Sequence, residues 1–411
     1  MTSPLKVAHV LRKYDDAELG GTETHVQEIT RRLSRHGVDC EVHAPAGPRG
    51  GGALAVPLVR YRAFCPFVGS AERRRALWAT AGNLVSLEEP LRLARDRSLS
   101  LVHLHTGGRI GGGVRTAMRL TGRPYVVSVH GPLFSGEEFL AADTARRRLG
   151  TLDVGRPLGL LFGARRVIGD AARVLCFNDE EYRALQARIG TRAVRMDHGV
   201  DRARFQSGVA ARARRRWPSL GTSPIVLQVG RLCVQKDQLL AMRAFAAGAP
   251  RDHLLVFAGP ETDPGYRACL EAEARALGIA QRLHFLGAVD PDAVADLLAA
   301  ASLCLAPSQH EAFGLLVLEA WAAGRPALFA RVGGLADLAQ ALGSGAPALC
   351  VREPRAWALA LAALLGDAQG RSNAAAAGAA LLTHRFSWDR AAAALADLYR
   401  DVLAERTRRV A

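Results

Sequence analysis

Short apolar runs alternate with amphipathic stretches along the whole chain. The runs are rich in Val, Leu, Ile and Ala and are bounded by Gly, Pro, Asp or Asn, which is typical of buried β-strands. They predict two sets of strands. The first set is at residues 7–11, 38–44, 101–106, 124–130, 173–177 and 193–197, and the second is at residues 224–229, 253–258, 282–287, 302–306, 326–330 and 347–351.

Helical patterns lie between these runs. One helix is expected to begin near Thr22, to place Val26, Ile29 and Leu33 on one face, and to end at Gly37. Because strands alternate with helices, each set predicts a parallel sheet whose ligands bind at the carboxyl ends of the strands. A chain of 411 residues is too long for one ordinary core and suits two α/β domains.

The most informative segment follows the strand predicted at residues 302–306. Glu311 lies in a short loop, Gly314 comes next, and Glu319 lies within an apolar helix. A helix that starts at glycine leaves backbone N–H groups and the positive end of its dipole facing an anion. A carboxylate among apolar side chains requires strong donors, which ribose hydroxyls supply. The segment favours a nucleotide-sugar site; a buried helix with one capping and one ion-paired glutamate is the simpler alternative.

Lysine is scarce in this chain. Of 54 cationic side chains only three are lysine, and Lys236 lies just after the strand at 224–229. Lysine acts as a compact point charge and arginine as a rigid fork, so the pair Arg231 and Lys236 suits a diphosphate. A chance lysine in a surface turn is the alternative.

Further motifs occur in a fixed order along the chain. They are Gly20-Gly21-Thr22, the strands that end at His105 and His130, Gly199-Val200-Asp201, Gly230-Arg231-Leu232 with Lys236, residues 311–319, Gly333-Gly334, and Phe386-Ser387-Trp388 with Tyr399. In these motifs the chain resembles the retaining, nucleotide-sugar-dependent glycosyltransferases of family 4 over nearly its whole length. The two glutamates with Phe-Gly-Leu between them are the most specific part, whereas paired glycines alone are weak.

The resemblance implies a GT-B fold, in which two Rossmann-like, doubly wound parallel-sheet domains face each other across a cleft. It implies an acceptor-binding domain at residues 1–203 and a donor-binding domain at residues 204–387. The closing helix, at residues 388–411, is expected to cross back and pack on the first domain.

The resemblance also implies the roles of the site residues. Glu319 would bind the ribose, Glu311 the donor sugar, and Arg231 with Lys236 the diphosphate. His130 would face the donor sugar and the acceptor, and a strand-end histidine satisfied by backbone is its alternative. The catalytic set is therefore His130, Arg231, Lys236 and Glu311, and the remaining donor-binding residues are Gly20, Gly21, Gly230, Phe313, Gly314, Leu315, Leu316 and Glu319.

We therefore expect a retaining hexosyltransferase that uses a nucleotide diphosphate sugar and an unidentified small-molecule, lipid or glycan acceptor. We expect UDP rather than GDP as the nucleotide of the donor, and this choice rests only on the breadth of the family. A nucleotide-sugar epimerase on the same fold and, further away, a non-catalytic basic binding protein are the alternatives.

No metal or other cofactor is expected. Asp290-Pro291-Asp292 matches a metal-binding Asp-x-Asp pair, but it directly precedes an apolar helical pattern. Asp at the cap, Pro at the first position and Asp in the first turn are usual at a helix start.

The net charge of +15 does not by itself indicate nucleic acid, because no basic stripe interleaved with aromatics and no recognised module is present. Runs at residues 73–75 and 146–148 leave open a peripheral contact with an anionic membrane, against solvated helix faces. A monomer or homodimer is expected.

Seven scattered cysteines without metal-ligand spacing predict reduced, buried thiols. No signal peptide and no run of membrane-spanning length is seen, which predicts a cytoplasmic protein, with contact at the inner membrane face left open.

Overall fold

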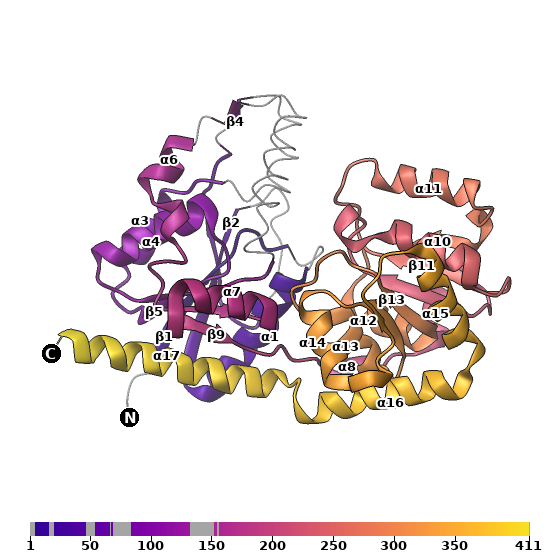
Figure 1. The fold of residues 1–411 in the computed structure, drawn as a ribbon. Helices are drawn as coiled ribbons and strands as arrows, with labels where there is room; N and C mark the ends of the chain where they lie inside the picture. Colours follow the sequence, from indigo (N-terminus) through magenta and orange to yellow (C-terminus); the bar gives the residue numbers. More distant parts are fainter. Residues whose placement is uncertain are drawn as a thin grey trace. The chain divides into compact units, whose positions relative to one another are not determined.

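The computed structural model describes residues 5–15, 20–46, 54–65, 67–68, 84–131, 152–153 and 156–410. The chain divides into two compact units. One comprises Met1–Asp197 with Trp388–Ala411, and the other comprises His198–Ser387. Figure 1 shows the ribbon of both units, with labels on many of their helices and strands.

Within the described residues, the first unit contains a seven-stranded parallel sheet in the order β3-β2-β1-β5-β6-β8-β9. Its strands are β1 (Leu5–Val10), β2 (Val38–Pro45), β3 (Leu58–Tyr61), β5 (Leu101–Leu104), β6 (Tyr125–Ser128), β8 (Arg173–Cys176) and β9 (Ala193–Arg195). Its helices are α1 (Gly21–Leu33), α3 (Glu88–Arg95), α4 (Gly108–Leu120), α6 (Arg156–Leu161), α7 (Asp179–Ile189) and α17 (Trp388–Val410), and β4 (Phe67–Val68) pairs separately with β7 (Leu152–Asp153).

The second unit has a six-stranded parallel sheet, again counted over the described residues, in the order β12-β11-β10-β13-β14-β15. Its strands are β10 (Ile225–Val229), β11 (Leu254–Ala258), β12 (Leu283–Phe285), β13 (Ala301–Ala306), β14 (Ala327–Ala330) and β15 (Ala348–Leu349). Its helices are α8 (Arg202–Gln206), α9 (Ala210–Arg216), α10 (Gln238–Gly248), α11 (Tyr266–Ala276), α12 (Pro291–Ala300), α13 (Leu315–Ala322), α14 (Gly333–Leu342), α15 (Pro354–Gly366) and α16 (Ala368–His384).

Both strand orders are doubly wound. In the first sheet the order reverses between β1 and β5, and in the second it reverses between β10 and β13. Loops that leave such neighbouring strands at their carboxyl ends diverge and leave room for a ligand. The predicted site residues follow β10 and β13 in the second unit, so the fold places them at this reversal.

The pattern of apolar runs predicted the larger strands but not β3. β3 has only four residues, and three of them are half-buried. It pairs with β2 at the edge of the sheet. An edge strand of this length has too little apolar alternation for the sequence pattern to reveal it.

The junction between the units lies at Asp197 and His198, whereas the bounds implied by the family resemblance meet at residues 203 and 204. The intervening residues lead into α8, which packs on α12 and α13 and buries Phe205. This short helix therefore belongs to the core of the second unit.

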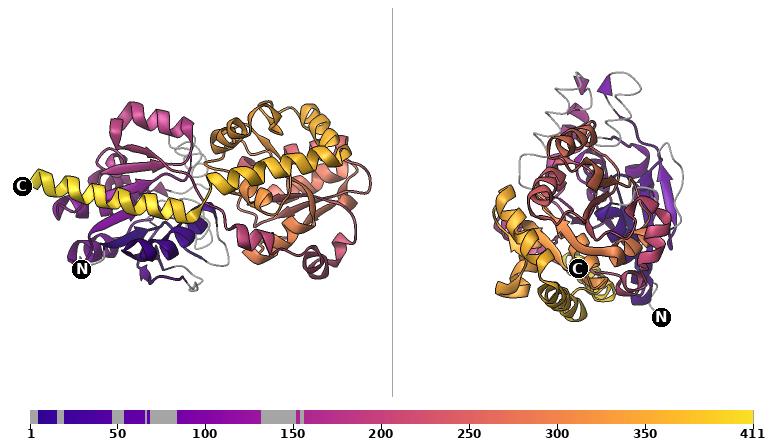
Figure 2. Two further views of the ribbon diagram at one scale, coloured as in Figure 1. Left: turned by 90° about the horizontal axis from the view of Figure 1, so that it is seen from below. Right: turned by 90° about the vertical axis from the view of Figure 1, so that its right-hand side faces the viewer.

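The closing helix α17 packs against α1 of the first unit, and Figure 2 shows it running along that unit. Asp389 lies 3.4 Å from Nε of Arg32 and 3.2 Å from NH1 of Arg35. The Trp388 ring lies edge-on to His25, with the ring centroids 5.7 Å apart. The last helix of the chain, α17, thus packs onto the first unit as part of it.

Two expectations were drawn from composition. The one about cysteines needs revision, and the one about arginine runs concerns residues outside the described part. Cys40, Cys176, Cys233 and Cys304 are buried and Cys65 is half-buried, but Cys269 and Cys350 are exposed, so the prediction of buried thiols is wrong for these two. The arginine runs at 73–75 and 146–148 lie outside the described residues.

A further arginine-rich run, at residues 212–216, lies in α9. Arg212 binds Asp296 at 2.7 Å and Arg216 binds Asp290 at 2.6 Å, so these charges are compensated within the protein. No helix in the described part of the chain combines the length and apolar character that crossing a membrane requires.

Candidate active site

The loop between β13 and α13 is fixed by glycine. Gly314 has φ 97°, a conformation that favours glycine, and it caps α13. A Cβ atom at Gly314 would lie 2.3 Å from Cδ2 of Leu335 in α14, so packing also excludes a side chain there.

The start of α13 presents backbone N–H groups. The first bond back to its cap runs from Val317 N–H to the Gly314 carbonyl, at 3.0 Å. Among the described residues, the N–H groups of Leu315 and Leu316 have no hydrogen-bond acceptor. Together with the positive end of the helix dipole, these donors form the anion-binding arrangement predicted from Gly314.

The paired glycines at the start of α14 hold this loop in place. Gly334 N–H donates to the carbonyl of Glu311 at 2.9 Å. A Cβ at Gly333 would lie 2.2 Å from that same carbonyl oxygen, and one at Gly334 would lie 2.4 Å from Cα of Phe313. Only glycine permits this approach, so the motif has a packing role in shaping the loop that carries Glu311.

Lys236 and Glu311 contact each other directly. Lys236 ends a short turn after β10, and its Nζ lies 2.5 Å from Oε2 of Glu311. Their side chains are 21% and 18% exposed, so the pair is screened from water yet reachable by a ligand. The loops are also joined by a bond from Gln309 N–H to the carbonyl of Gln235, at 2.8 Å. The structure thus brings together two residues that are far apart in the sequence.

Arg231 and Gly230 lie on the same loop as Lys236. Gly230 has φ 150°, and its N–H donates to the carbonyl of Ala258 at 2.8 Å. The Arg231 side chain is exposed, with NH2 3.5 Å from Oε1 of Gln235. It is therefore the more accessible of the two predicted cations.

Glu319 is half-buried on α13. Burial raises the pKa of its carboxyl to about 7, against the opposing charges of Arg204 and Lys236. No hydrogen bond to this carboxyl is present among the described residues. A desolvated carboxyl without a donor, beside a cation and a helix start, has the properties of a ligand-binding group.

The Asp-x-Asp motif has the structure of a helix cap. The Asp290 side chain accepts a hydrogen bond from Ala293 N–H at 2.8 Å, and Pro291 begins α12. Asp290 also binds Arg216, and Asp292 is 3.7 Å from Nε of Arg204. Each carboxylate already has a cationic partner.

The glycine loop of the first unit begins α1. Gly20 caps the helix, and its N–H donates to Oε2 of Glu23 at 3.1 Å. This N–H therefore already has an acceptor, and Gly21 is the first helical residue. The residues directly before Gly20 lie outside the described part.

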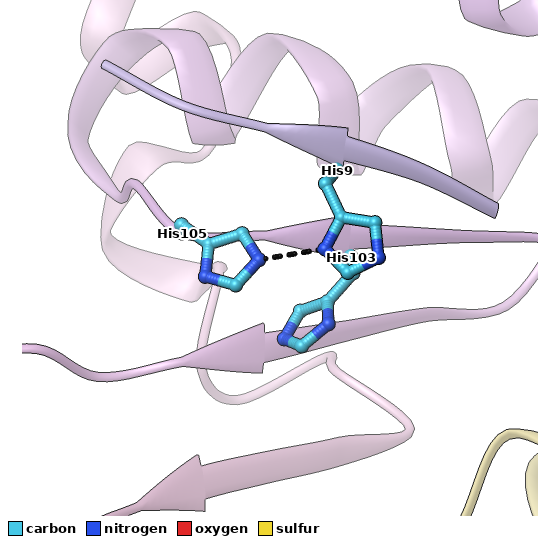
Figure 3. Close-up of side chains that lie close together, drawn as sticks. All are labelled: His9, His103 and His105. Atoms are coloured by element: carbon cyan, nitrogen blue, oxygen red, sulfur yellow. Dashed lines mark hydrogen bonds between the residues drawn. The ribbon is translucent and has the colours of Figure 1, made fainter. Parts of the chain in front are cut away.

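His130 follows β6 and is half-buried. Its ring lies next to those of His25 and His105. Its Nε2 lies 2.9 Å from Nδ1 of His105, and its ring centroid lies 5.1 Å from that of Phe177. Two groups of three histidines have ring nitrogens within 4.8 Å of one another: His9 with His103 and His105, and His25 with His105 and His130. Figure 3 shows the first group.

Sequence reasoning treated His9, His103 and His105 only as strand residues. The available signal was the spacing of His103 and His105, which points both side chains to one face of β5. His9 joins them because it is the register partner of His103 in the neighbouring strand.

Comparisons with known proteins agree with this fold. Residues 20–197 match the model of the glycosyl transferase 4-like domain, and residues 210–381 match that of glycosyl transferases group 1. The fold is also similar to sucrose-phosphate synthase from Thermosynechococcus elongatus, with a TM-score of 0.75 at 20% identity over 98% of this chain and 100% of that one. HepE of Anabaena, solved with UDP and glucose, gives 0.72 at 18% identity, over 97% of this chain and 100% of that one.

The two α/β units therefore form the GT-B fold of glycosyltransferases. A relative named D-inositol 3-phosphate glycosyltransferase, from Salinispora tropica, is 32% identical over 95% of this chain and 83% of its own length. The chain belongs to the GT-B glycosyltransferases with a family-4-like N-terminal domain.

Proposed function

We propose that this glycosyltransferase is a retaining enzyme that moves a hexosyl unit from a nucleotide diphosphate sugar, with UDP as the preferred nucleotide. The observation that carries the proposal is the group formed by Lys236, Glu311, Glu319 and the start of α13. These residues combine a cation, a helix dipole with unused N–H donors, and a desolvated carboxyl at one sheet edge.

Each residue has a distinct role in this proposal. Lys236, Arg231 and the N–H groups of α13 stabilise the negative charge that grows on the diphosphate as the glycosidic bond breaks. Glu319 accepts hydrogen bonds from the ribose, and Glu311 binds the donor sugar while it orients Lys236. No covalent nucleophile is proposed; the departing phosphate takes the acceptor proton on the same face of the sugar.

The acceptor to test first is inositol 3-phosphate. Relatives at about 30% identity carry that acceptor in their name, and they match over more than 90% of this chain. The acceptor is expected to approach His130 in the first unit, with a hydroxyl as the nucleophile.

The decisive experiment is a thermal-shift screen against UDP and GDP sugars, followed by turnover assays with inositol 3-phosphate. A ligand present at about 100 times its Kd stabilises the folded protein by about 2.7 kcal/mol, which is readily measured. Incubation with the donor alone separates the alternatives, because an epimerase changes the sugar whereas a transferase only hydrolyses it slowly. A protein stabilised by none of the nucleotide sugars contradicts the proposal.

We expect turnover to be independent of added divalent metal. The positive charge at the diphosphate comes from Lys236, Arg231 and a helix dipole, so a chelator removes none of it. The measurement is the rate with and without EDTA. Loss of most of the activity, restored by Mg²⁺ or Mn²⁺, would show that Lys236, Arg231 and the helix dipole do not neutralise the diphosphate by themselves.

We also expect retention of configuration at the anomeric carbon. An α-linked donor is expected to give an α-linked product, because attack and departure occur on the same face of the sugar. Proton NMR of the anomeric signal of the first-formed product distinguishes the two results. A β linkage from an α donor excludes the proposed mechanism.

A further inference from the structure

Three histidines of the first unit form a hydrogen-bonded chain, which we call the histidine chain: His130, His105 and His9. Nε2 of His130 lies 2.9 Å from Nδ1 of His105, and Nε2 of His105 lies 3.0 Å from Nδ1 of His9. His9 and His105 are buried, and His130 is half-buried at the end of β6. The dashed line in Figure 3 marks the bond between His9 and His105.

The orientation of the rings supports hydrogen bonds rather than face-to-face stacking. The rings of His9 and His105 lie within 15° of parallel with their centroids 5.3 Å apart, and those of His105 and His130 lie within 28° at 5.2 Å. Since the facing nitrogens are only about 3 Å apart, each pair meets edge to edge. This is the geometry in which one ring N–H points at the lone pair of the next ring.

The histidines of this chain are neutral. Burial lowers the pKa of His9 and of His130 to about 3, and it lowers that of His105 well below the usual range. A neutral imidazole donates through one nitrogen and accepts through the other. All hydrogen bonds in the chain must therefore run in the same direction, and the groups at its inner end decide which.

The inner end contacts acceptors. Tyr399 on α17 has its hydroxyl 2.6 Å from Nδ1 of His103 and 3.5 Å from Nε2 of His9. We assign its single proton to the shorter bond, with Nδ1 of His103 as the acceptor, which leaves the oxygen as an acceptor for His9. The Cys40 thiol points to the carbonyl of Val38, at 3.9 Å, so its sulfur, 3.7 Å from Nε2 of His9, is also an acceptor. His9 consequently carries its proton on Nε2.

We propose that His9, His105 and Tyr399 are positioning residues that hold His130 as the Nε2–H tautomer, with the lone pair on Nδ1. The direction follows step by step: His9 accepts at Nδ1 from His105, and His105 accepts at Nδ1 from Nε2–H of His130. Under the proposed function, on which this inference rests, the tautomer sets whether each ring nitrogen of His130 can donate or accept a hydrogen bond toward a sugar hydroxyl.

The same histidines could instead bind a transition metal, since imidazole nitrogens are common ligands. Two observations favour the hydrogen-bonded chain. Both nitrogens of His105 have ring partners, and both nitrogens of His103 are bonded, to Tyr399 and to Ser128 at 2.8 Å. A metal would have to replace several of these bonds within a fully buried cluster. Metal content is therefore measured as one outcome of the test.

The test reads the tautomer directly. In protein labelled with ¹⁵N-histidine, two-bond ¹H–¹⁵N correlations distinguish the two neutral forms, and the His130 signals are those lost in His130→Gln. We expect Nε2–H in the wild type and in His9→Asn, whose amide oxygen can replace the accepting Nδ1. In His9→Leu, His105 loses its acceptor, so the chain reverses and His130 becomes Nδ1–H. We expect kcat in His9→Leu to fall about 10–100-fold, by analogy with the loss of a hydrogen-bond partner that orients a metal-bound histidine.

Val102→Ala is the matched control. Val102 is buried in the same strand as His103, and strand alternation points it to the other face of the sheet. It is expected to lower stability without changing the His130 tautomer. Nδ1–H in the wild type, an unchanged tautomer in His9→Leu, or stoichiometric zinc in the purified protein would each overturn the proposal. Because the NMR result does not depend on turnover, correct tautomers in a protein without transferase activity would contradict the proposed function and leave the histidine chain intact.

Discussion

Replacing Lys236 with alanine is expected to lower kcat about 100- to 1000-fold, the scale of losing one preorganised group that stabilises transition-state charge. Negative charge on the diphosphate grows as the glycosidic bond breaks, so an ammonium beside it contributes more in the transition state than in the ground state. The effect should therefore appear in kcat at saturating donor rather than in donor affinity alone. Steady-state kinetics with varied nucleotide sugar measure both.

Two variants separate the charge of Lys236 from its position. Lys236→Arg keeps the charge but replaces a compact ammonium by a planar fork, so only partial activity should return. Glu311→Gln removes the partner 2.5 Å from the ammonium while keeping the shape of the side chain. We expect it also to lower kcat, because Lys236 is then no longer held in place.

Lys6 provides the matched control. It is ion-paired like Lys236, with Nζ 3.1 Å from carboxylate oxygens of Glu41 and Asp96, but it lies on β1 of the first unit and is not among the residues of the proposed donor site. Lys6→Ala should turn over normally. Wild-type turnover of Lys236→Ala at saturating donor would mean that the diphosphate binds elsewhere.

The residues of the proposed donor site could be picked out from the sequence because most of them lie in short, ordered motifs. Glu311, Gly314 and Glu319 all belong to one strand-loop-helix segment, so their spacing already places them at one sheet edge. Lys236 belongs to the loop of the neighbouring strand. Its contact with Glu311 depends on the β10–β13 pairing, which no local pattern encodes.

The histidine chain could not be read from the sequence in the same way. His9 and His105 come from neighbouring strands, and Tyr399 comes from the last helix, which returns to the first unit. Apolar periodicity shows that these strands are buried. The polar side chains within them interrupt the pattern, but the pattern does not indicate which side chains they contact. Local motifs thus predict sites built on one or two adjacent loops, whereas networks across a sheet and a distant helix require the structure.

The Lys236–Glu311 pair and Glu319 differ in their electrostatic roles in the proposed donor site. Glu311 already neutralises the charge of Lys236, so an incoming diphosphate shares the Lys236 ammonium with the Glu311 carboxylate. Glu319 has no donor among the described residues, and its pKa is already about 7. Binding is therefore expected to change the protonation of Glu319, because hydroxyl donors favour the carboxylate form.

Replacing Glu319 with alanine is expected to weaken donor binding about 10- to 100-fold, since hydrogen bonds to a charged group contribute roughly 1.5–3 kcal/mol. Because the ribose is remote from the reacting carbon, kcat at saturating donor should change much less. Glu319→Gln keeps the shape and one acceptor oxygen, so a smaller loss is expected. Isothermal titration with the nucleotide diphosphate gives the affinities without requiring the acceptor.

The pH dependence makes this test specific to Glu319. Its carboxyl has a raised pKa of about 7 in the free protein, so it is mostly protonated below that pH and mostly ionised above it. If the ribose binds the ionised form, affinity rises with pH, by roughly tenfold between pH 6 and pH 8, and levels off above. The nucleotide phosphates also titrate near this range, but their contribution remains in Glu319→Gln, so the difference between the two curves isolates the carboxyl. Parallel curves for the wild type and Glu319→Gln, or an alanine variant with unchanged affinity, would place the ribose away from α13.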